Sequence, residues 1–423
     1  MGFIYGILAL SFLIIVHETG HFTVAKLSGI KVLEFSLFMG PQLFSFKKGE
    51  TLYSIRAFPI GGYVKMEGEE EASDDDRAYN KKPVWIRSAV ILAGPLMNIV
   101  LGIVLFYILV SMRGFTTTEL QIVPEDSALK RANLEPGDRI VEFDNKKVYT
   151  DLDIGLFNIV NKKEEVNLKV VKKDTGKLEE MNVKLDALDA PQYLLGVSID
   201  KDLPNIVSKD SGKFKEKDKI IKLNNNDVEN IKQIRSFMAK NGTKTVTVTI
   251  ERDGEKVVFE VKPRENIFYG VHTLGDAQYK VEKGNAIQDL KNSFISSYSA
   301  VRYIYYNVVF LVSGKVSFSE MAGPVGIVDV IGTQVEETET TNEKIITLLF
   351  FIALITINLG LVNLVPFPAL DGSKIVILGV EAIRRKPISP EKEAAITAVG
   401  LVLLIGLLIF VTYNDILRAI RGY

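Results

Sequence analysis

Two histidines and a glutamate near the N-terminus have the spacing of a zinc site. Residues 16–21 read V-H-E-T-G-H, so His17 and His21 stand four positions apart with Glu18 between them. On a helix both imidazoles project from one face and can bind one zinc ion, with Glu18 beside them as a general base. These residues predict a metalloprotease, in which zinc activates a water and polarises a peptide carbonyl.

The composition restricts both the third zinc ligand and the partners. The 423-residue chain has 3 histidines and no cysteine, so the third ligand is either His272 or a carboxylate. The chain has 51 Lys and Arg against 52 Asp and Glu, which is not the basic excess that accompanies binding to a phosphate backbone. We therefore expect no nucleic-acid partner.

The zinc motif interrupts a segment that is apolar enough to lie in a bilayer. Residues 3 to 26 have the length of a membrane helix, and the motif falls inside them. Ionisable side chains at membrane depth are costly and are usually functional. The segment lacks the basic region and the cleavage site of a signal peptide, so we expect it to be retained as the first span.

Three further apolar runs are each close to the length of a bilayer span: Ser88–Met112, Ile345–Val365 and Ala394–Val411. Lys and Arg concentrate between the first two spans and between the last two, which predicts that both loops are cytoplasmic. The chain is thus expected to be a polytopic α-helical membrane protein with four transmembrane helices and an extracytoplasmic region from about 113 to 342. Buried helices of a soluble protein are the alternative, and four such runs around a polar middle disfavour it.

The first cytoplasmic loop contains a stretch with the pattern of β-structure. Over residues 35–66, short apolar or alternating runs are separated by Gly40-Pro41 and by a charged turn at residues 47–50. The pattern predicts small β-hairpins that end at residues 59–62, P-I-G-G. An unpaired strand edge near the active helix would pair with an extended substrate, and a purely structural hairpin is the alternative.

The extracytoplasmic region contains an internal repeat. Residues 134–148 align without gaps with residues 214–228, and each copy is followed by a helical stretch and alternating strands. Two copies are too few for a solenoid, so we expect tandem α+β domains at about 115–187 and 191–264. The first copy resembles PDZ domains of membrane proteases in its L-x-P-G-D-x-I run. The second resembles them more loosely, because Lys217 replaces the glycine.

A helix and a connector are expected between the repeats and the third span, over residues 285–342. Apolar and aromatic side chains recur at helical spacing in Ala286–Val312, with tyrosines suited to a bilayer interface. Packing on the second repeat is the alternative. The segment 323–327, G-P-V-G-I, is expected to break the chain before the third span.

A second candidate for chemistry lies at the end of the third span. In residues 358–372, N-L-G-L-V-N-L-V-P-F-P-A-L-D-G, Pro366 and Pro368 must disrupt the helix, and Gly372 permits a sharp turn after Asp371. Unwound backbone at membrane depth is tolerated only where protein buries it or where it lines a cavity. Asp371 is therefore the best candidate for the third ligand. The alternative third ligand, His272, lies in the expected extracytoplasmic region and would have to reach across the membrane.

In their order along the chain, these motifs resemble the bacterial regulator of sigma-E protease branch of the site-2 proteases. The match comprises H-E-x-x-H in the first span, L-A-G-P-L-M-N at Leu92–Asn98 in the second, the PDZ-like repeats, G-P-V-G-I, and N-x-x-P-x-P-x-L-D-G in the third. The chain departs from the family at residues 38–41, F-M-G-P, where the family more often has G-F-G-P.

The resemblance implies roles for five residues. His17, His21 and Asp371 would bind zinc. Glu18 would be the catalytic base, and Asn363 would hold the substrate backbone near the metal. The resemblance also implies that the β-hairpins are membrane-associated and pair with an unfolded substrate helix, and that the PDZ-like domains filter substrates by size.

The expected function is that of a zinc-dependent intramembrane endopeptidase that cleaves transmembrane segments of single-pass proteins, such as anti-sigma factors or signal-peptide remnants. The enzyme would be a multi-pass protein of the bacterial cytoplasmic membrane, with extracytoplasmic PDZ-like domains and an active site toward the cytoplasm. A catalytically silent membrane scaffold that presents PDZ domains is the alternative, and the intact motif argues against it. The expected domains are 1–112, 115–187, 191–264, 285–342 and 343–423.

Overall fold

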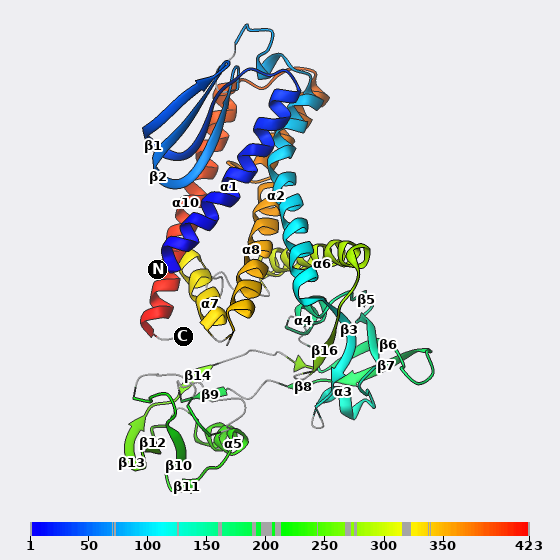
Figure 1. The fold of residues 1–423 in the computed structure, drawn as a ribbon, viewed down its shortest axis with the longest axis vertical. Coiled ribbons are helices and arrows are strands. Elements are labelled where there is room, and N and C mark those ends of the chain that lie inside the picture. The colour runs from blue at the N-terminus through cyan, green and yellow to red at the C-terminus, as the bar shows by residue number, and fades with distance from the viewer. Residues whose placement is uncertain are drawn as a thin grey trace. The chain divides into compact units, whose positions relative to one another are not determined.

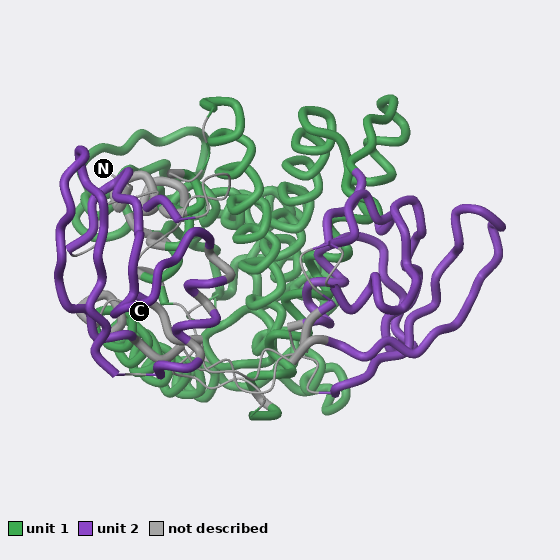
Figure 2. Tube along the Cα trace, turned by 90° about the horizontal axis from the view of Figure 1, so that it is seen from below, with its two compact units in different colours: residues 1–117, 281–423 green, residues 118–280 purple. Residues whose placement is uncertain are grey.

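The computed structural model describes residues 2–69, 71, 73–124, 127–159, 163–187, 192–195, 205–207, 213–242, 244–266, 272–274, 277–314, 323–336, 338 and 340–421. The chain divides into two compact units (Figure 2). The first comprises Met1–Thr117 and Val281–Tyr423, and the second comprises Thr118–Lys280.

Long apolar helices form the framework of the first unit. In Figure 1, α1 (Gly2–Leu27) and α8 (Thr341–Asn363) lie beside α2 (Val84–Arg113), and both pack against it. Among the described residues, three helices are long and apolar enough to cross a membrane, namely α2, α8 and most of α10 (Pro390–Arg421). They coincide with the second, third and fourth predicted spans. The predicted first span forms α1, and its crossing of the bilayer stays a prediction.

Strands β1 (Val32–Lys48) and β2 (Thr51–Met66) each bend back on themselves. Residues 34–37 pair on one side with residues 52–55, and residues 32–39 pair on the other side with residues 58–66. The prediction that β2 ends at residues 59–62 is wrong, because the strand continues to Met66. Among the described residues its second half pairs on one side only, and Pro59 is not one of the paired positions, so its missing N–H costs no ladder bond. The Pro59 carbonyl instead accepts a hydrogen bond from Ser11 Oγ of α1 at 2.5 Å.

The bend of β1 contains a residue in the left-handed region. Phe38, the first residue of the F-M-G-P run, has a φ of 69°. A side chain in this conformation costs about 1–2 kcal/mol relative to glycine. Phe38, where the sequence departs from the G-F-G-P pattern, is therefore a strained position of β1.

Aromatic packing and an ion-pair cluster fix the sheet to α1. Phe22 of α1 contacts Phe35 of β1 edge to face, with ring centroids 5.1 Å apart. Glu50, in the turn between the strands, pairs with Lys26 at the end of α1 and with Arg77, at 2.8 and 2.6 Å. Arg77 and Lys26 lower the pKa of Glu50 to about 2. The turn is thus held to the helix that carries the histidines.

The G-P-V-G-I segment begins a helix, α7 (Pro324–Glu336). The carboxylate of Asp415, in α10, is buried and accepts the N–H groups of Gly323 and Gly326 at 3.0 and 2.8 Å. The first N–H groups of a helix lack partners within the helix, so the carboxylate supplies them. The segment therefore joins two helices of the first unit, a function that its sequence did not indicate.

Helix α6 (Ala286–Val312) has the bounds that the sequence predicted. Asn285 and Gln288 form a capping box at its start. The helix packs against α2 and α8 while Leu290, Phe294 and Tyr305 are exposed. Its position at a bilayer interface stays a prediction.

The two larger sheets of the second unit, among the described residues, follow the two copies of the repeat. The first has the strand order β16-β3-β4-β6-β7, with β5 beside β4. Its strands are β3 (Phe115–Ile122), β4 (Arg139–Phe143), β5 (Lys146–Lys147), β6 (Glu165–Val171), β7 (Leu178–Lys184) and β16 (Gln278–Glu282), accompanied by helices α3 (Ala128–Arg131) and α4 (Asp151–Ile159). The strand β16 comes from beyond the second copy, so the chain returns to the first sheet after completing the second.

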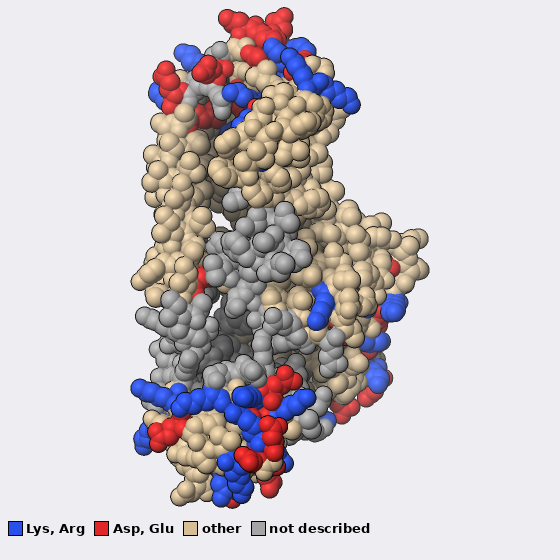
Figure 3. All heavy atoms as spheres, turned by 60° about the vertical axis from the view of Figure 1, so that its left-hand side comes forward, with Lys and Arg blue, Asp and Glu red and all other residues tan. Residues whose placement is uncertain are grey.

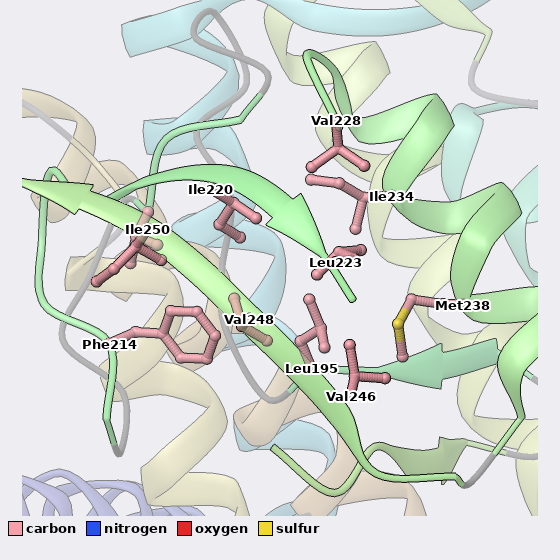
Figure 4. Packing of buried hydrophobic residues seen from close by; sticks show 11 residues of the cluster. Leu195, Phe214, Ile220, Leu223, Val228, Ile234, Met238, Val246, Val248 and Ile250 are labelled. Atoms are coloured by element: carbon pink, nitrogen blue, oxygen red, sulfur yellow. The ribbon is translucent and has the colours of Figure 1, made fainter. Parts of the chain in front are cut away.

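The second sheet has the order β11-β10-β12-β13. It is formed by β10 (Lys219–Leu223), β11 (Asn226–Asp227), β12 (Val246–Arg252) and β13 (Glu255–Val261), and α5 (Ile231–Asn241) accompanies it. Figure 4 shows Ile220, Leu223 and Val248 of the strands directed into a common core with Met238 of α5. Short two-stranded sheets pair β9 (Gln192–Leu194) with β14 (Arg264–Asn266), and β8 (Asp186–Ala187) with β15 (His272–Thr273).

The two copies of the repeat share one turn. Asp138 and Asp218 are buried, and each carboxylate accepts the backbone N–H of the residue three positions before it. The residue before each aspartate has a positive φ, 101° at Gly137 and 71° at Lys217. The second copy therefore keeps the backbone conformation of the first without the glycine that favours it.

We predict that Lys217→Gly stabilises the second sheet by roughly 0.5–1 kcal/mol. Relief of the left-handed strain contributes about 1–2 kcal/mol, and the greater freedom of glycine in the unfolded chain removes about 0.5–1 kcal/mol. Hydrogen exchange of the amides in β10 and β12 of the full-length protein measures the change. The matched change Gly137→Ala should destabilise the first sheet, since Gly137 has a φ of 101°, which an L side chain rarely adopts. Faster exchange in the Lys217→Gly variant would contradict the account.

Candidate metal centre

Three metal-ligating side chains converge from α1 and from α9 (Asp371–Arg384). Asp371 Oδ2 lies 3.0 Å from Nε2 of His17 and 3.4 Å from Nε2 of His21, and the two nitrogens are 3.1 Å apart. Both histidines are buried. The structure thus brings together the three residues that the sequence selected as zinc ligands, from opposite ends of the chain.

The donor set fits zinc. Four ligands about 2.0–2.1 Å from a tetrahedral zinc lie about 3.3 Å from one another, close to the three separations found. Nδ1 of His21 lies 2.8 Å from the carbonyl oxygen of Val90, so the neutral ring donates there and turns the lone pair of Nε2 toward Asp371. Asp371 Oδ2 is buried without a hydrogen-bond partner among the described residues. Converging lone pairs of this kind suit a cation, which would lie between them.

Helix α2 approaches the histidines through glycine. A Cβ at Gly94 would lie 2.3 Å from Nε2 of His21 and 2.8 Å from Nε2 of His17, and one at Gly20 would lie 2.3 Å from the carbonyl oxygen of Ala93. Any larger residue would displace the helix or enter the centre. Pro95 lies inside α2 and lacks the N–H that would bond to the carbonyl of Ile91, the residue after the Val90 whose carbonyl pairs with His21.

The interruption between α8 and α9 presents Asp371. Helix α8 ends at Asn363, α9 begins at Asp371, and the two prolines lie between them, as predicted. The prediction of a sharp turn at Gly372 is wrong, because this glycine lies within α9. Its role is steric, since a Cβ there would lie 2.3 Å from the carbonyl oxygen of Val365. Ala369 is the residue of the break that adopts a positive φ, of 76°.

An ion pair holds α9 to the loop after β2. Lys374, one turn after Asp371, lies 2.9 Å from Glu69. The negative charge of Glu69 raises the pKa of Lys374. A second ion pair joins the far end of α9 to α2, between Glu381 and Arg87 at 2.7 Å. Both ends of the helix that carries Asp371 are thereby fixed.

The other two predicted site residues lie beside the triad. Glu18 is half-buried, and its Cγ would be 3.7 Å from a Cβ on Gly62, so the second half of β2 passes next to it. Asn363 is the last residue of α8, and its amide nitrogen lies 3.5 Å from Nδ1 of His17. A potential general base, an amide and a strand edge therefore surround the metal-ligating atoms.

Comparison with known proteins places this geometry in a family. The model of peptidase family M50 matches residues 5–407. The chain belongs to peptidase family M50.

Its relatives in this family match over nearly their whole length. A protein of Clostridium acetobutylicum is 31% identical over 418 residues, which are 99% of this chain and 98% of the relative. Zinc metalloprotease RasP of Oceanobacillus iheyensis is 30% identical and covers 97% of this chain and 98% of its own. RasP of Geobacillus kaustophilus is 28% identical, with coverage of 96% and 95%. The M50 peptidase described here is a zinc metalloprotease, and its apolar helices make it a membrane protein.

The sequence did not reveal several residues that shape the centre of the M50 peptidase. The motif Leu92–Asn98 carried the resemblance without a role, yet it supplies Gly94 and Asn98 to the centre. Its glycine and proline inside an apolar helix were the available signal. The pair of Glu69 and Lys374 joins positions more than three hundred residues apart, and no local pattern marks it.

We predict that Gly94→Ala lowers the zinc content of the purified peptidase to less than about half of the wild-type value. The methyl group would overlap the ring of His21, so the ligand has to move. Gly406→Ala in α10 is the matched control, because a Cβ there has no neighbour within 4 Å among the described atoms. Elemental analysis of both variants measures bound zinc. Equal zinc in the two would show that α2 does not confine the histidines.

Proposed function

We propose that this M50 peptidase is a zinc-dependent intramembrane endopeptidase that cleaves the transmembrane segments of single-pass membrane proteins, with anti-sigma factors or signal-peptide remnants as substrates. The observation that supports it is the convergence of His17, His21 and Asp371 beside apolar helices of spanning length. A metal centre among such helices suits a peptide bond that itself lies in the bilayer.

The chain's own residues supply the remaining chemistry. When bound, zinc acts as a Lewis acid that polarises the scissile carbonyl and lowers the pKa of a water molecule. His17, His21 and Asp371 would hold it. Glu18 accepts the proton of the attacking water and returns it to the leaving amine.

The substrate segment must be extended before it is cut, because a helical peptide bond is shielded by its own hydrogen bonds. Residues 58–66 of β2 pair on one side only and pass next to Glu18. We assign this edge to strand addition by the substrate backbone, which would hold the unwound form. Asn363, close to His17, would donate to the substrate backbone at the cleavage position.

We propose further that α1 is a fourth transmembrane helix and that the two repeat copies are extracytoplasmic PDZ-like domains that filter substrates by size. The domains are then 1–112, 115–187, 191–264, 285–342 and 343–423. In Figure 3, acidic and basic side chains gather over one end of the first unit, and the surface over its helices is largely uncharged. With that end in the cytoplasm of a bacterium, the metal centre lies toward the cytoplasmic side of the membrane.

We expect Glu18→Gln to bind zinc like the wild type and to reduce cleavage of a co-expressed single-pass substrate by at least about 100-fold. The amide keeps the shape of the side chain and cannot take a proton, and general bases contribute about 10²–10⁴-fold. Immunoblotting of the substrate and elemental analysis of the purified variant are the measurements. Glu34→Gln is a control, because Glu34 lies in β1 and pairs with Arg56. Undiminished cleavage by the Glu18→Gln variant would exclude this residue as the base.

Replacement of Asp371 by Ala should leave less than about a tenth of the wild-type zinc after dialysis against a weak chelator. Two imidazoles alone are an incomplete ligand set for zinc. The conservative change Asp371→Glu should retain more metal than the alanine variant. Full zinc occupancy in Asp371→Ala would require another third ligand.

A further inference from the structure

The two histidines of the metal centre differ in what supports them. A metal-binding histidine donates its other ring N–H to an acceptor, which fixes the ring and raises its basicity. His21 has the Val90 carbonyl at 2.8 Å for this purpose. Nδ1 of His17 instead faces two side-chain amides, at 3.4 Å from Asn98 and 3.5 Å from Asn363.

Asn98 has an unused acceptor at this position. It belongs to α2 and is fully buried, and its amide oxygen has no hydrogen-bond partner among the described residues. The amide nitrogen faces His17, and a half-turn about the Cβ–Cγ bond would exchange nitrogen and oxygen without changing the shape of the side chain. The oxygen would then face the N–H of a ring whose Nε2 is committed to the metal.

We propose that Asn98 is the positioning residue of His17, accepting its Nδ1–H and thereby setting the tautomer and orientation of this ligand. The inference rests on the proposed zinc site. It assigns Asn98 no contact with the substrate or the reacting atoms. A buried polar atom left unpaired costs about 1–3 kcal/mol. Zinc at Nε2 leaves the proton of His17 on Nδ1, and the Asn98 oxygen gains a partner when it faces this N–H. Zinc binding and this orientation of the amide therefore stabilise each other.

Asn98 suits this role better than Asn363. Its position is fixed where α2 packs against α8, since a Cβ on Gly360 would be 3.4 Å from Asn98 Cβ and 2.8 Å from the carbonyl oxygen of Pro95. Asn363 is only half-buried and ends its helix, next to the break. The two amides therefore have different roles: Asn98 positions His17, and Asn363 stays available to the substrate.

Zinc affinity of the full-length protein in detergent tests the proposal, measured by competition with a chromogenic chelator. Asn98→Leu removes the acceptor at similar volume and should weaken zinc binding about 10–100-fold. Asn98→Asp keeps the acceptor and should bind zinc within a few-fold of the wild type. Asn98→Ala provides a second deletion if leucine disturbs the packing. Circular dichroism of the zinc-free variants checks that each is folded.

Three results would overturn the proposal. Wild-type affinity in a folded Asn98→Leu or Asn98→Ala variant would show that His17 needs no such partner. An aspartate variant as weak as the leucine variant would indicate packing rather than acceptance of a hydrogen bond. A loss confined to Asn363→Leu would assign the role to Asn363. Failure of the zinc site itself is a separate result, because the wild type would then bind no zinc at all.

Discussion

Imidazole and carboxylate groups buried among apolar helices need partners for their lone pairs. The rest of the first unit depends on this constraint. Asp371, His17 and His21 meet among apolar helices, where a buried donor or acceptor needs a specific partner. Val90 supplies one through its carbonyl. The packing follows from the same need, because glycines of α1 and α2 let the helices close on the imidazoles. A zinc ion held by these three side chains would supply a partner for their converging lone pairs.

Ion pairs also hold the elements of the candidate site in place. The ion pairs of Glu69 with Lys374 and of Arg87 with Glu381 hold both ends of α9, and Glu50 with Lys26 holds the sheet to α1. These contacts link α1, which carries two of the candidate ligands, α9, which carries the third, and β2, whose edge we propose for the substrate.

The sequence was informative wherever the physics is local. Hydropathy and length located α2, α8 and α10, helical periodicity placed both histidines on one face, and two prolines set the break that presents Asp371. It failed where the physics is non-local. The double pairing of β1 and the partner of His17 arise from contacts between distant segments, which no window of sequence contains. The prediction of a turn at Gly372 was wrong because the sequence does not distinguish a glycine that permits a turn from one that permits close approach of the backbone.

The central claim is that one zinc ion joins the two ends of the chain inside the bundle. Anomalous diffraction at the zinc absorption edge, from crystals of the full-length protein, tests it most directly. The account predicts a single strong peak about 2.0–2.2 Å from Nε2 of His17, Nε2 of His21 and a carboxylate oxygen of Asp371. A peak bound by the two histidines without Asp371, or one located at His272, would contradict it.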